Sequence, residues 1–412
     1  MVRSSLALAA LATTAIPGLD VVATRPPQST TTEFQTTGLL DAGGRSWVVR
    51  APLTPAAGAA LEGEVALLGQ LVREVDEGRL PFDVPRPAGF AELPEGGRAM
   101  IHRALVGRPL AIDELTAGPG VSAALGRAIA AFHELDSSVV ANAGLPVYDP
   151  NAYRTRRLAE VDEAARTGRV PAALLNRWEH ALEDVRLWRF RPTPVHGDLA
   201  PEHVLVTEGR VSGVLGLSEV HVGDPAEDLA WLQASAPEEA LDTIEEAYSL
   251  ARTESADATL MDRALLVSEL ALARWLLHGV RTGEESVVED AAEMLRVLAA
   301  DVADAPEIGA TERTAGRVAE SAPHVAPREE QTGAEHVADD EQGDPTAETE
   351  GRGAEATDEP ETEATADDAP GDEDEAPRRS DPAGVTENLD LGSKLPDFLA
   401  GRGNRDDDGE RR

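Results

Sequence analysis

Apolar residues in the first hundred positions recur with periods of two and of about 3.6, which predicts a small sheet carrying a helix. Alternation predicts strands at residues 34–40 and 45–50, joined by a turn at 41–44 that contains two glycines. A helical period follows over residues 55–78, and a further strand is predicted at 99–103.

The first 19 residues allow two interpretations. Arg3 followed by the apolar run 6–11 resembles a weak secretory signal. The alternative is an alanine-rich helix that leads through Pro17 and Gly18 into a strand at residues 20–24. We favour the helix, because the predicted sheet needs the strand that follows it.

Beyond Pro109 the pattern is almost wholly helical, with one interruption. The interruption is a pair of short β-prone runs, 203–207 and 211–215, on either side of a glycine-containing turn at 208–210, and we interpret it as a hairpin. Helices are predicted at 121–135, 171–188, 225–235, 237–255, 260–280 and 284–303. A small sheet followed by a helical part predicts an α+β fold.

Composition divides the chain near Asp304. Residues 305–412 contain 31 acidic and 11 basic side chains, with one aromatic residue, Phe398. Such a segment buries too little apolar surface to offset the entropy of ordering, so we predict a disordered acidic tail. An apolar patch at 387–399 is either a docking segment for a protein partner or a chance cluster, and we favour chance slightly.

Charge and cysteine content exclude several classes of function. The first 304 residues carry 45 acidic and 26 basic side chains, which argues against binding to nucleic acid or to anionic lipid. The absence of cysteine excludes disulfides and thiolate chemistry. No uninterrupted apolar run reaches the roughly 18 residues of a membrane span, and we expect a cytoplasmic protein.

One segment combines residues that suggest chemistry. His196-Gly197-Asp198-Leu199 stands directly before the predicted hairpin. A carboxylate placed in such a loop is suited to receive or orient the proton of a hydroxyl group. An aspartate in a turn is also commonly a local cap, so Asp198 alone would leave the two roles about evenly balanced.

These residues, with the order of the predicted elements, resemble the aminoglycoside phosphotransferase family, and more closely its macrolide phosphotransferase branch, over about residues 15–303. The resemblance implies a protein-kinase-like fold with an N-lobe at 1–105 and a helical C-lobe at 106–304. It implies transfer of a phosphoryl group from ATP or GTP to a small-molecule hydroxyl. Asp198 and His196 are then the candidate catalytic residues.

The metal site departs from the family pattern. The asparagine that normally binds metal falls at His203, and the metal-binding aspartate falls at Gly216. Mg²⁺ prefers oxygen ligands, so we favour His203 as a donor to phosphate or as a packed residue over His203 as a ligand. Glu219 or Glu227 would replace the lost carboxylate only from a neighbouring turn, and we expect both on a solvated face. Restoring the carboxylate by Gly216→Asp is expected to raise activity.

Two further groups of residues follow from the resemblance. Arg50 stands where kinase-like folds have their phosphate-binding lysine, with Glu64 as its expected partner and Glu62 as a competitor. The alternative to this ion pair is that Arg50 is a surface arginine with no ion-pair partner. The acidic residues Asp224, as the cap of a helix with Pro225 in its first position, and Asp228 fit structural roles near the catalytic loop.

The phosphate-covering loop and the hinge are less clearly marked. The loop 26–32 lacks glycines, although Ser29 and the threonines at 30–32 are able to donate to phosphate, and residues 103–108 enter the hinge. Two functions therefore stay open. One is a small-molecule kinase; the other is a pseudokinase that binds nucleotide or a small ligand without transfer and uses its acidic tail to engage a partner.

Overall fold

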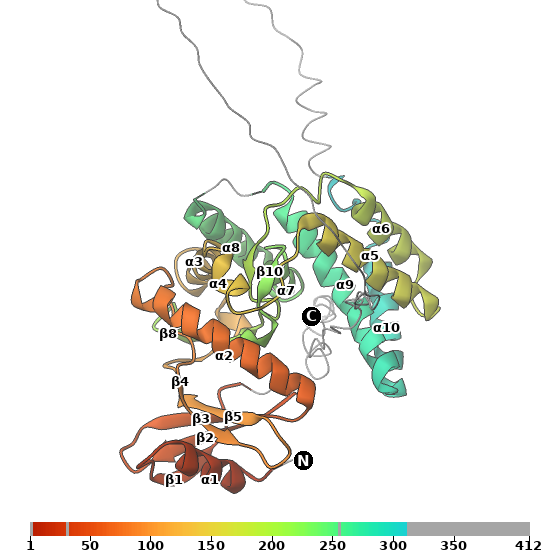
Figure 1. Ribbon diagram of the computed structural model, residues 1–412. Coiled ribbons are helices and arrows are strands. Elements are labelled where there is room, and N and C mark those ends of the chain that lie inside the picture. The colour runs from red at the N-terminus through yellow and green to blue at the C-terminus, as the bar shows by residue number, and fades with distance from the viewer. Residues whose placement is uncertain (1–2, 30–32, 254–256, 311–412) are drawn as a thin grey trace, which may run out of the picture. The chain divides into compact units, whose positions relative to one another are not determined.

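The computed structural model describes residues 3–29, 33–253 and 257–310. Within these ranges a five-stranded antiparallel sheet precedes a mostly helical part (Figure 1). The predicted α+β fold class is confirmed. Beyond position 310, the predicted tail and its apolar patch at 387–399 lie outside the described residues.

The elements of the sheet region are α1 (Ser5–Ala15), β1 (Val21–Arg25), β2 (Phe34–Asp41), β3 (Ser46–Pro52), α2 (Pro55–Asp76), β4 (Pro87–Glu92) and β5 (Arg98–Arg103). The next elements are β6 (Arg108–Pro109), η1 (Ile112–Glu114), α3 (Val121–His133), α4 (Ser138–Ala141), α5 (Pro150–Arg166), α6 (Ala172–Glu183) and β7 (Thr193–Val195). The last are η2 (Pro201–His203), β8 (Val204–Thr207), β9 (Arg210–Val214), η3 (Leu217–Glu219), β10 (His221–Gly223), α7 (Glu227–Ser235), α8 (Glu238–Ala251), α9 (Leu260–Thr282) and α10 (Glu285–Asp301).

The predicted N-terminal helix and strand, the β2–β3 hairpin, α2, β5 and the β8–β9 hairpin are all present. Strand β4 was not predicted, because its sequence contains a proline and a glycine, which argue against a central strand. The sheet order β1-β2-β3-β5-β4 places β4 at an edge, where a missing N–H is tolerated. The short strands β7 and β10, which pair with each other, also had no periodic signal.

The two faces of the sheet have different partners. Alternate side chains of β3 point to opposite faces, so Trp47, Val49 and Ala51 pack with α1, while Val48 and Arg50 face the other way. Pairing between the strands then sets which residues share a face with Arg50. It places Thr36 and Met100 opposite Arg50. The register of the sheet therefore decides which side chains line the site described below.

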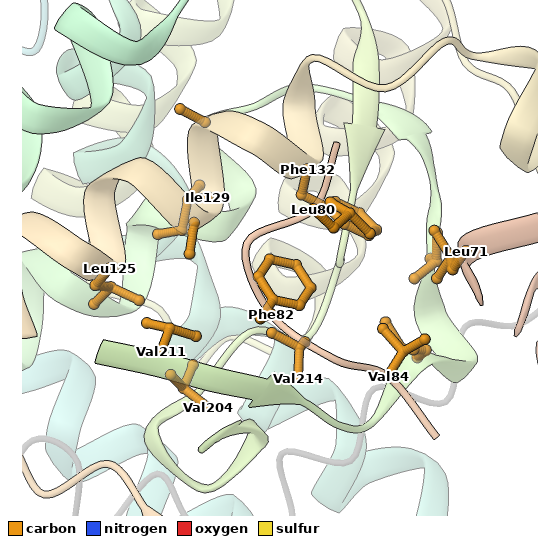
Figure 2. Packing of buried hydrophobic residues seen from close by; sticks show 14 of the residues in the cluster. Leu71, Leu80, Phe82, Val84, Leu125, Ile129, Phe132, Val204, Val211 and Val214 are labelled. Carbon is orange, nitrogen blue, oxygen red and sulfur yellow. The ribbon is translucent and has the colours of Figure 1, made fainter. Parts of the chain in front are cut away.

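A second core joins the sheet region to the helical part. Leu71 of α2, Phe132 of α3 and Val214 of β9 belong to one buried cluster (Figure 2). Figure 2 shows Phe82, from the connection between α2 and β4, among these side chains. This shared core also contains Phe34 of β2 and Met100 of β5, so the β8–β9 hairpin and the sheet region belong to one packed unit.

The helical part has its own core around α5, α6, α9 and α10. Its packing continues after α10, because Ile308 is buried in this cluster and Arg177 donates to the carbonyl oxygen of Pro306. The domain boundary at Asp304 stays a prediction. None of the helices in the described ranges combines the length and apolar character needed to cross a bilayer.

Helices α3 and α8 approach closely at Gly126. A Cβ atom at this position would overlap the carbonyl oxygen of Ile244 on α8. We therefore expect Gly126→Ala to lower the free energy of unfolding by about 1–3 kcal/mol through overpacking. The measurement is urea unfolding of the full chain.

Gly69→Ala is the matched control for this prediction. Gly69 lies in α2, and a Cβ atom there would meet nothing within 4 Å. Alanine is the better helix former, so this variant should be about 0.5–1 kcal/mol more stable than the wild type. Equal effects of the two substitutions would contradict the close approach of α3 and α8.

Candidate active site

The segment after β7 is held by one buried carboxylate. Asp228 in the first turn of α7 accepts hydrogen bonds from the backbone N–H of His196 at 2.7 Å and of Gly197 at 3.0 Å. Its third donor is the Nε2–H of His133, at 3.0 Å. The Nδ1 atom of His133 in turn lies 2.9 Å from the hydroxyl of Tyr248, which donates to it. Three elements, α3, α7 and α8, thereby fix the start of the candidate catalytic loop.

The charge state of this cluster follows from burial and bonding. Burial alone raises the pKa of Asp228, but the hydrogen bonds from His133 and from the His196 backbone hold the pKa below its ordinary value. Burial lowers the pKa of His196, although the Asp228 charge opposes this. The neutral His196 ring donates from Nε2 to the Leu215 carbonyl oxygen at 2.7 Å. His196 thus ties the loop to the end of β9 and does not face the cavity described next.

The His203 ring connects the candidate base to Gly216. Its Nδ1–H donates to the carbonyl oxygen of Asp198 at 2.7 Å, and the ring is buried. Gly216 has a left-handed backbone with φ of 74°, and a Cβ atom there would lie 2.7 Å from the ring atoms Nε2 and Cδ2 of His203. The imidazole therefore fills the space that a side chain at position 216 would occupy.

Arg50 and Glu64 form a buried ion pair on the other side of Gly216. The Arg50 guanidinium is bonded to Glu64 of α2, lies 3.7 Å from the centre of the Phe34 ring, and reaches Ser218 Oγ at 3.4 Å. Glu62, the sequence competitor, instead binds Arg98 at 2.6 and 2.8 Å on the surface. The structure thus pairs Arg50 with Glu64.

A cavity lies between the sheet, α2 and the segment that follows β9, and its empty space of about 470 Å³ includes open solvent. Arg50, Glu64 and Gly216 line it, whereas Asp198, which is about a quarter exposed, and His203 are not among its lining residues. The full lining is Gln28, Ser29, Thr36, Val48, Arg50, Glu64, Pro85, Met100, His102, Leu215 and Gly216. The His203 ring and Gly216 join the cavity to the Asp198 loop.

Sequence analysis missed two polar lining residues, Gln28 and His102. Burial lowers the pKa of His102 to about 4, and its Nδ1–H donates to the Arg103 carbonyl oxygen, so this residue is neutral. The strand period around Arg50 would have identified His102 once the register was known. Ser29 lines the cavity as expected of a polar loop, and the threonines at 30–32 lie outside the described residues.

The residues present do not fit a magnesium ion. Across the described ranges no group of three or more potential metal-binding side chains comes together. Position 216 supplies no side-chain oxygen, and the His203 ring occupies its side-chain space. Mg²⁺ requires several oxygen ligands in near-octahedral geometry.

The two glutamates considered as replacements differ in their surroundings. Glu219 is half-buried in η3. Glu227 was expected on a solvated face, and this was wrong. Its side chain is only 8% exposed, with one oxygen 3.0 Å from His221 Nε2 and the other 3.1 Å from Arg157 Nη2. These two partners hold the Glu227 carboxylate in the core.

The predicted helix start at Pro225 also needs correction. Helix α7 begins at Glu227, and Asp224 accepts from the Ala226 N–H in the turn before it. Asp224 is fully buried. Arg263 of α9 satisfies its carboxylate by donating to both oxygens, at 2.8 and 3.0 Å. The sequence separation of 39 residues hid this pair from motif analysis.

A β-rich N-terminal region, a carboxylate-clamped loop before a hairpin and an Arg–Glu pair beneath the sheet define a kinase-like phosphotransferase fold. Residues 29–264 match the model of the phosphotransferase enzyme family, so the chain belongs to that family. The predicted fold and family are thereby confirmed.

Two curated relatives match part of the chain. Viomycin phosphotransferase of Streptomyces vinaceus is 38% identical over 100 residues, which are 23% of this chain and 33% of that protein. Uncharacterized protein YcbJ of Bacillus subtilis (strain 168) is 30% identical over 106 residues, 26% of this chain and 35% of that protein. The matched region thus spans about a third of the length of each of these curated relatives.

Solved structures match over a longer stretch. The macrolide 2'-phosphotransferase MphH from Brachybacterium faecium, solved as the apoenzyme, has 26% identity and a TM-score of 0.58 over 68% of this chain and 93% of its own. The GDP complex of wild-type aminoglycoside 2'-phosphotransferase-IIIa has 19% identity and a TM-score of 0.61, over 73% and 99% of the two chains. The second likeness concerns the fold alone.

The Asp228 clamp predicts a pH-dependent difference between the wild type and Asp228→Asn. An amide at this position cannot accept all three hydrogen bonds, so we expect the variant to be about 1–3 kcal/mol less stable at pH 7. A carboxylate whose folded pKa lies below its unfolded value stabilises the folded state above about pH 4 and loses this effect as the pH falls towards the folded pKa. The stability gap should therefore narrow below about pH 4. Urea unfolding from pH 7 to pH 3 measures it.

Asp113→Asn serves as the control for the same charge change at an exposed position in η1. This variant should follow the wild type throughout the pH range. A gap for Asp228→Asn that stays constant down to pH 3 would contradict a stabilising, ionised Asp228.

Proposed function

We propose that this protein is a nucleotide-dependent phosphotransferase that moves a phosphoryl group from ATP or GTP to a hydroxyl of a small-molecule substrate. The supporting observation is the connected geometry of the Asp198 loop, the His203–Gly216 contact and the cavity that holds Arg50. In this proposal the cavity receives the nucleotide, and the partly exposed Asp198 orients the acceptor hydroxyl.

Each residue has a role that its surroundings support. Arg50 is braced by Glu64 and Phe34, so its remaining N–H donors are held at the cavity wall, where phosphate oxygens would bind. Asp228 acts through the backbone of the loop and is a positioning residue. His196 is likewise a positioning residue in this proposal, because its ring bonds to the Leu215 carbonyl oxygen.

For the acceptor we propose a hydroxyl-bearing antibiotic of the macrolide type. The similarity to macrolide 2'-phosphotransferase structures, at 26% and 25% identity, supports this class. Viomycin phosphotransferase adds a peptide antibiotic to the acceptors that deserve testing. A panel of macrolides, aminoglycosides and viomycin with ATP or GTP is therefore the first assay.

The second candidate is a family member that binds nucleotide without transferring phosphate. The specific observation in its favour is Gly216, which lacks a carboxylate and lies against the His203 ring. Loss of one preorganised electrostatic group commonly lowers a rate by about 10²–10³-fold. Under this candidate, ATP or GTP raises the melting temperature equally with and without Mg²⁺, and no acceptor is modified.

Asp198→Asn tests the proposed transfer. The amide cannot accept the hydroxyl proton, so we expect the transfer rate to fall about 10²–10⁴-fold while nucleotide binding is kept. The transfer rate is measured from the release of nucleoside diphosphate, and nucleotide binding is measured by thermal shift. Glu208→Gln, in the exposed hairpin turn, removes the same charge as a control. An unchanged rate in Asp198→Asn would contradict the role of Asp198.

The His203–Gly216 contact changes the expectation for restoring the metal site. Gly216→Asp alone places a β-carbon against the imidazole and in a left-handed backbone, so it should lower stability by about 1 kcal/mol or more without creating a metal site. The pair His203→Asn with Gly216→Asp removes the ring and adds oxygen donors. It should bind ATP more tightly with Mg²⁺ than without, which thermal shift measures.

His203→Asn alone is the control for the double variant. It opens the space but supplies no carboxylate, so it should gain no dependence on Mg²⁺. If Gly216→Asp alone gains Mg²⁺-dependent binding with undiminished stability, the imidazole does not block the site.

A further inference from the structure

The chain segment after β5 carries a hydrogen-bond pair that the proposed function leaves unexplained. The carboxamide of Gln28 reaches the backbone of Leu105, 77 residues away. Its Oε1 accepts from the Leu105 N–H at 3.1 Å, and its Nε2 donates to the Leu105 carbonyl oxygen at 2.9 Å. A longer contact of 3.5 Å joins Nε2 to the Gly107 carbonyl oxygen. The Gln28 side chain thus forms hydrogen bonds with both the N–H and the C=O of Leu105.

This pattern has a chemical counterpart. A carboxamide presents one acceptor and one donor side by side. A purine base does the same, since adenine offers an exocyclic N–H next to a ring-nitrogen acceptor. A backbone N–H and C=O that accommodate Gln28 therefore also accommodate the edge of a purine.

The location of the pair links it to the proposed nucleotide site. Gln28 lines the same cavity as Arg50, and so do Met100 and His102 of β5. Leu105 follows His102 by three residues along the chain. The Leu105 backbone groups that Gln28 binds therefore lie next in the chain to the strand that lines the cavity with Arg50.

We propose that Gln28 is an internal stand-in for a purine base and that a nucleotide must displace it before the base can bind. The inference rests on the proposed nucleotide site and adds a control on access to it. In this structure the Gln28 carboxamide occupies the N–H and C=O groups of Leu105, while Arg50 and Glu64 line the same cavity as Gln28. Gln28 then competes with the base and not with the phosphates.

The expected size of the effect follows from the two bonds that must be broken. A neutral hydrogen bond contributes about 0.5–1.5 kcal/mol net, and apparent affinity falls in proportion to the fraction of competent molecules. Removing the carboxamide should therefore tighten purine nucleotide binding about fivefold to 150-fold. Binding of a ligand without a base should not change.

Isothermal titration calorimetry on the full chain tests the proposal with ATP, GTP and inorganic tripolyphosphate. The variants are Gln28→Ala and Gln28→Glu. The second keeps the side-chain length but sets a carboxylate oxygen against the Leu105 carbonyl oxygen, so it should release the hinge as well. Gln70→Ala, which makes the same substitution on α2 at a residue that does not line the cavity, is the matched control. Melting temperatures establish that each variant is folded.

The proposal is supported if both Gln28 variants bind ATP or GTP more tightly, if their binding of tripolyphosphate is unchanged, and if Gln70→Ala binds all three ligands as the wild type does. Equal gains for tripolyphosphate and the nucleotides overturn it, because the substitution would then act on the whole cavity. Unchanged or weaker nucleotide binding in both variants also overturns it, and the proposed function stands if the wild type binds nucleotide. If neither the wild type nor the variants bind any nucleotide, the proposed function fails and this inference falls with it.

Discussion

The buried carboxylate of Asp228 is the interaction on which the rest of the site depends. A charged group without solvent is tolerated only when hydrogen bonds satisfy it, and here three donors from two elements do so. The backbone N–H groups of His196 and Gly197 need the carboxylate in turn, because burying them without a hydrogen-bond acceptor would also cost free energy. Satisfying the charge therefore fixes the loop that presents Asp198, and the packing of α3 and α8 around His133 keeps the carboxylate in place.

The sheet imposes a second constraint of a different kind. Side chains alternate between its faces, and one residue of slip would move Arg50 to the α1 side and Val49 into the cavity. The apolar face against α1 prevents this slip, since burying Arg50 there would leave its charge without a partner. Packing on the far face of the sheet thus decides the chemistry of the near face.

Sequence reasoning succeeded where the signal is local and failed where it is not. The β8–β9 hairpin and α2 followed from residue periodicity and turn residues, and motif resemblance drew attention to Asp198, Arg50 and Glu64. Strand β4 was hidden because an edge strand tolerates proline and glycine that a central strand would not. The Arg263–Asp224 pair joins residues far apart in sequence, so no spacing rule exposes it. Ion pairs between residues far apart in sequence depend on the tertiary structure, so they could not be predicted from a single sequence.

The contact between His203 and Gly216 shows that these two positions constrain each other. The imidazole uses the space beside Gly216, and the left-handed backbone there disfavours a β-carbon, so each residue limits what the other position tolerates. Among the described residues that line the cavity, the positively charged side chain is that of Arg50, which is paired with Glu64. A guanidinium paired with a carboxylate offsets less phosphate charge than a divalent ion does. In the proposed nucleotide site, affinity would depend more heavily on the base, and Gln28 bonds the Leu105 backbone groups that we propose the base uses.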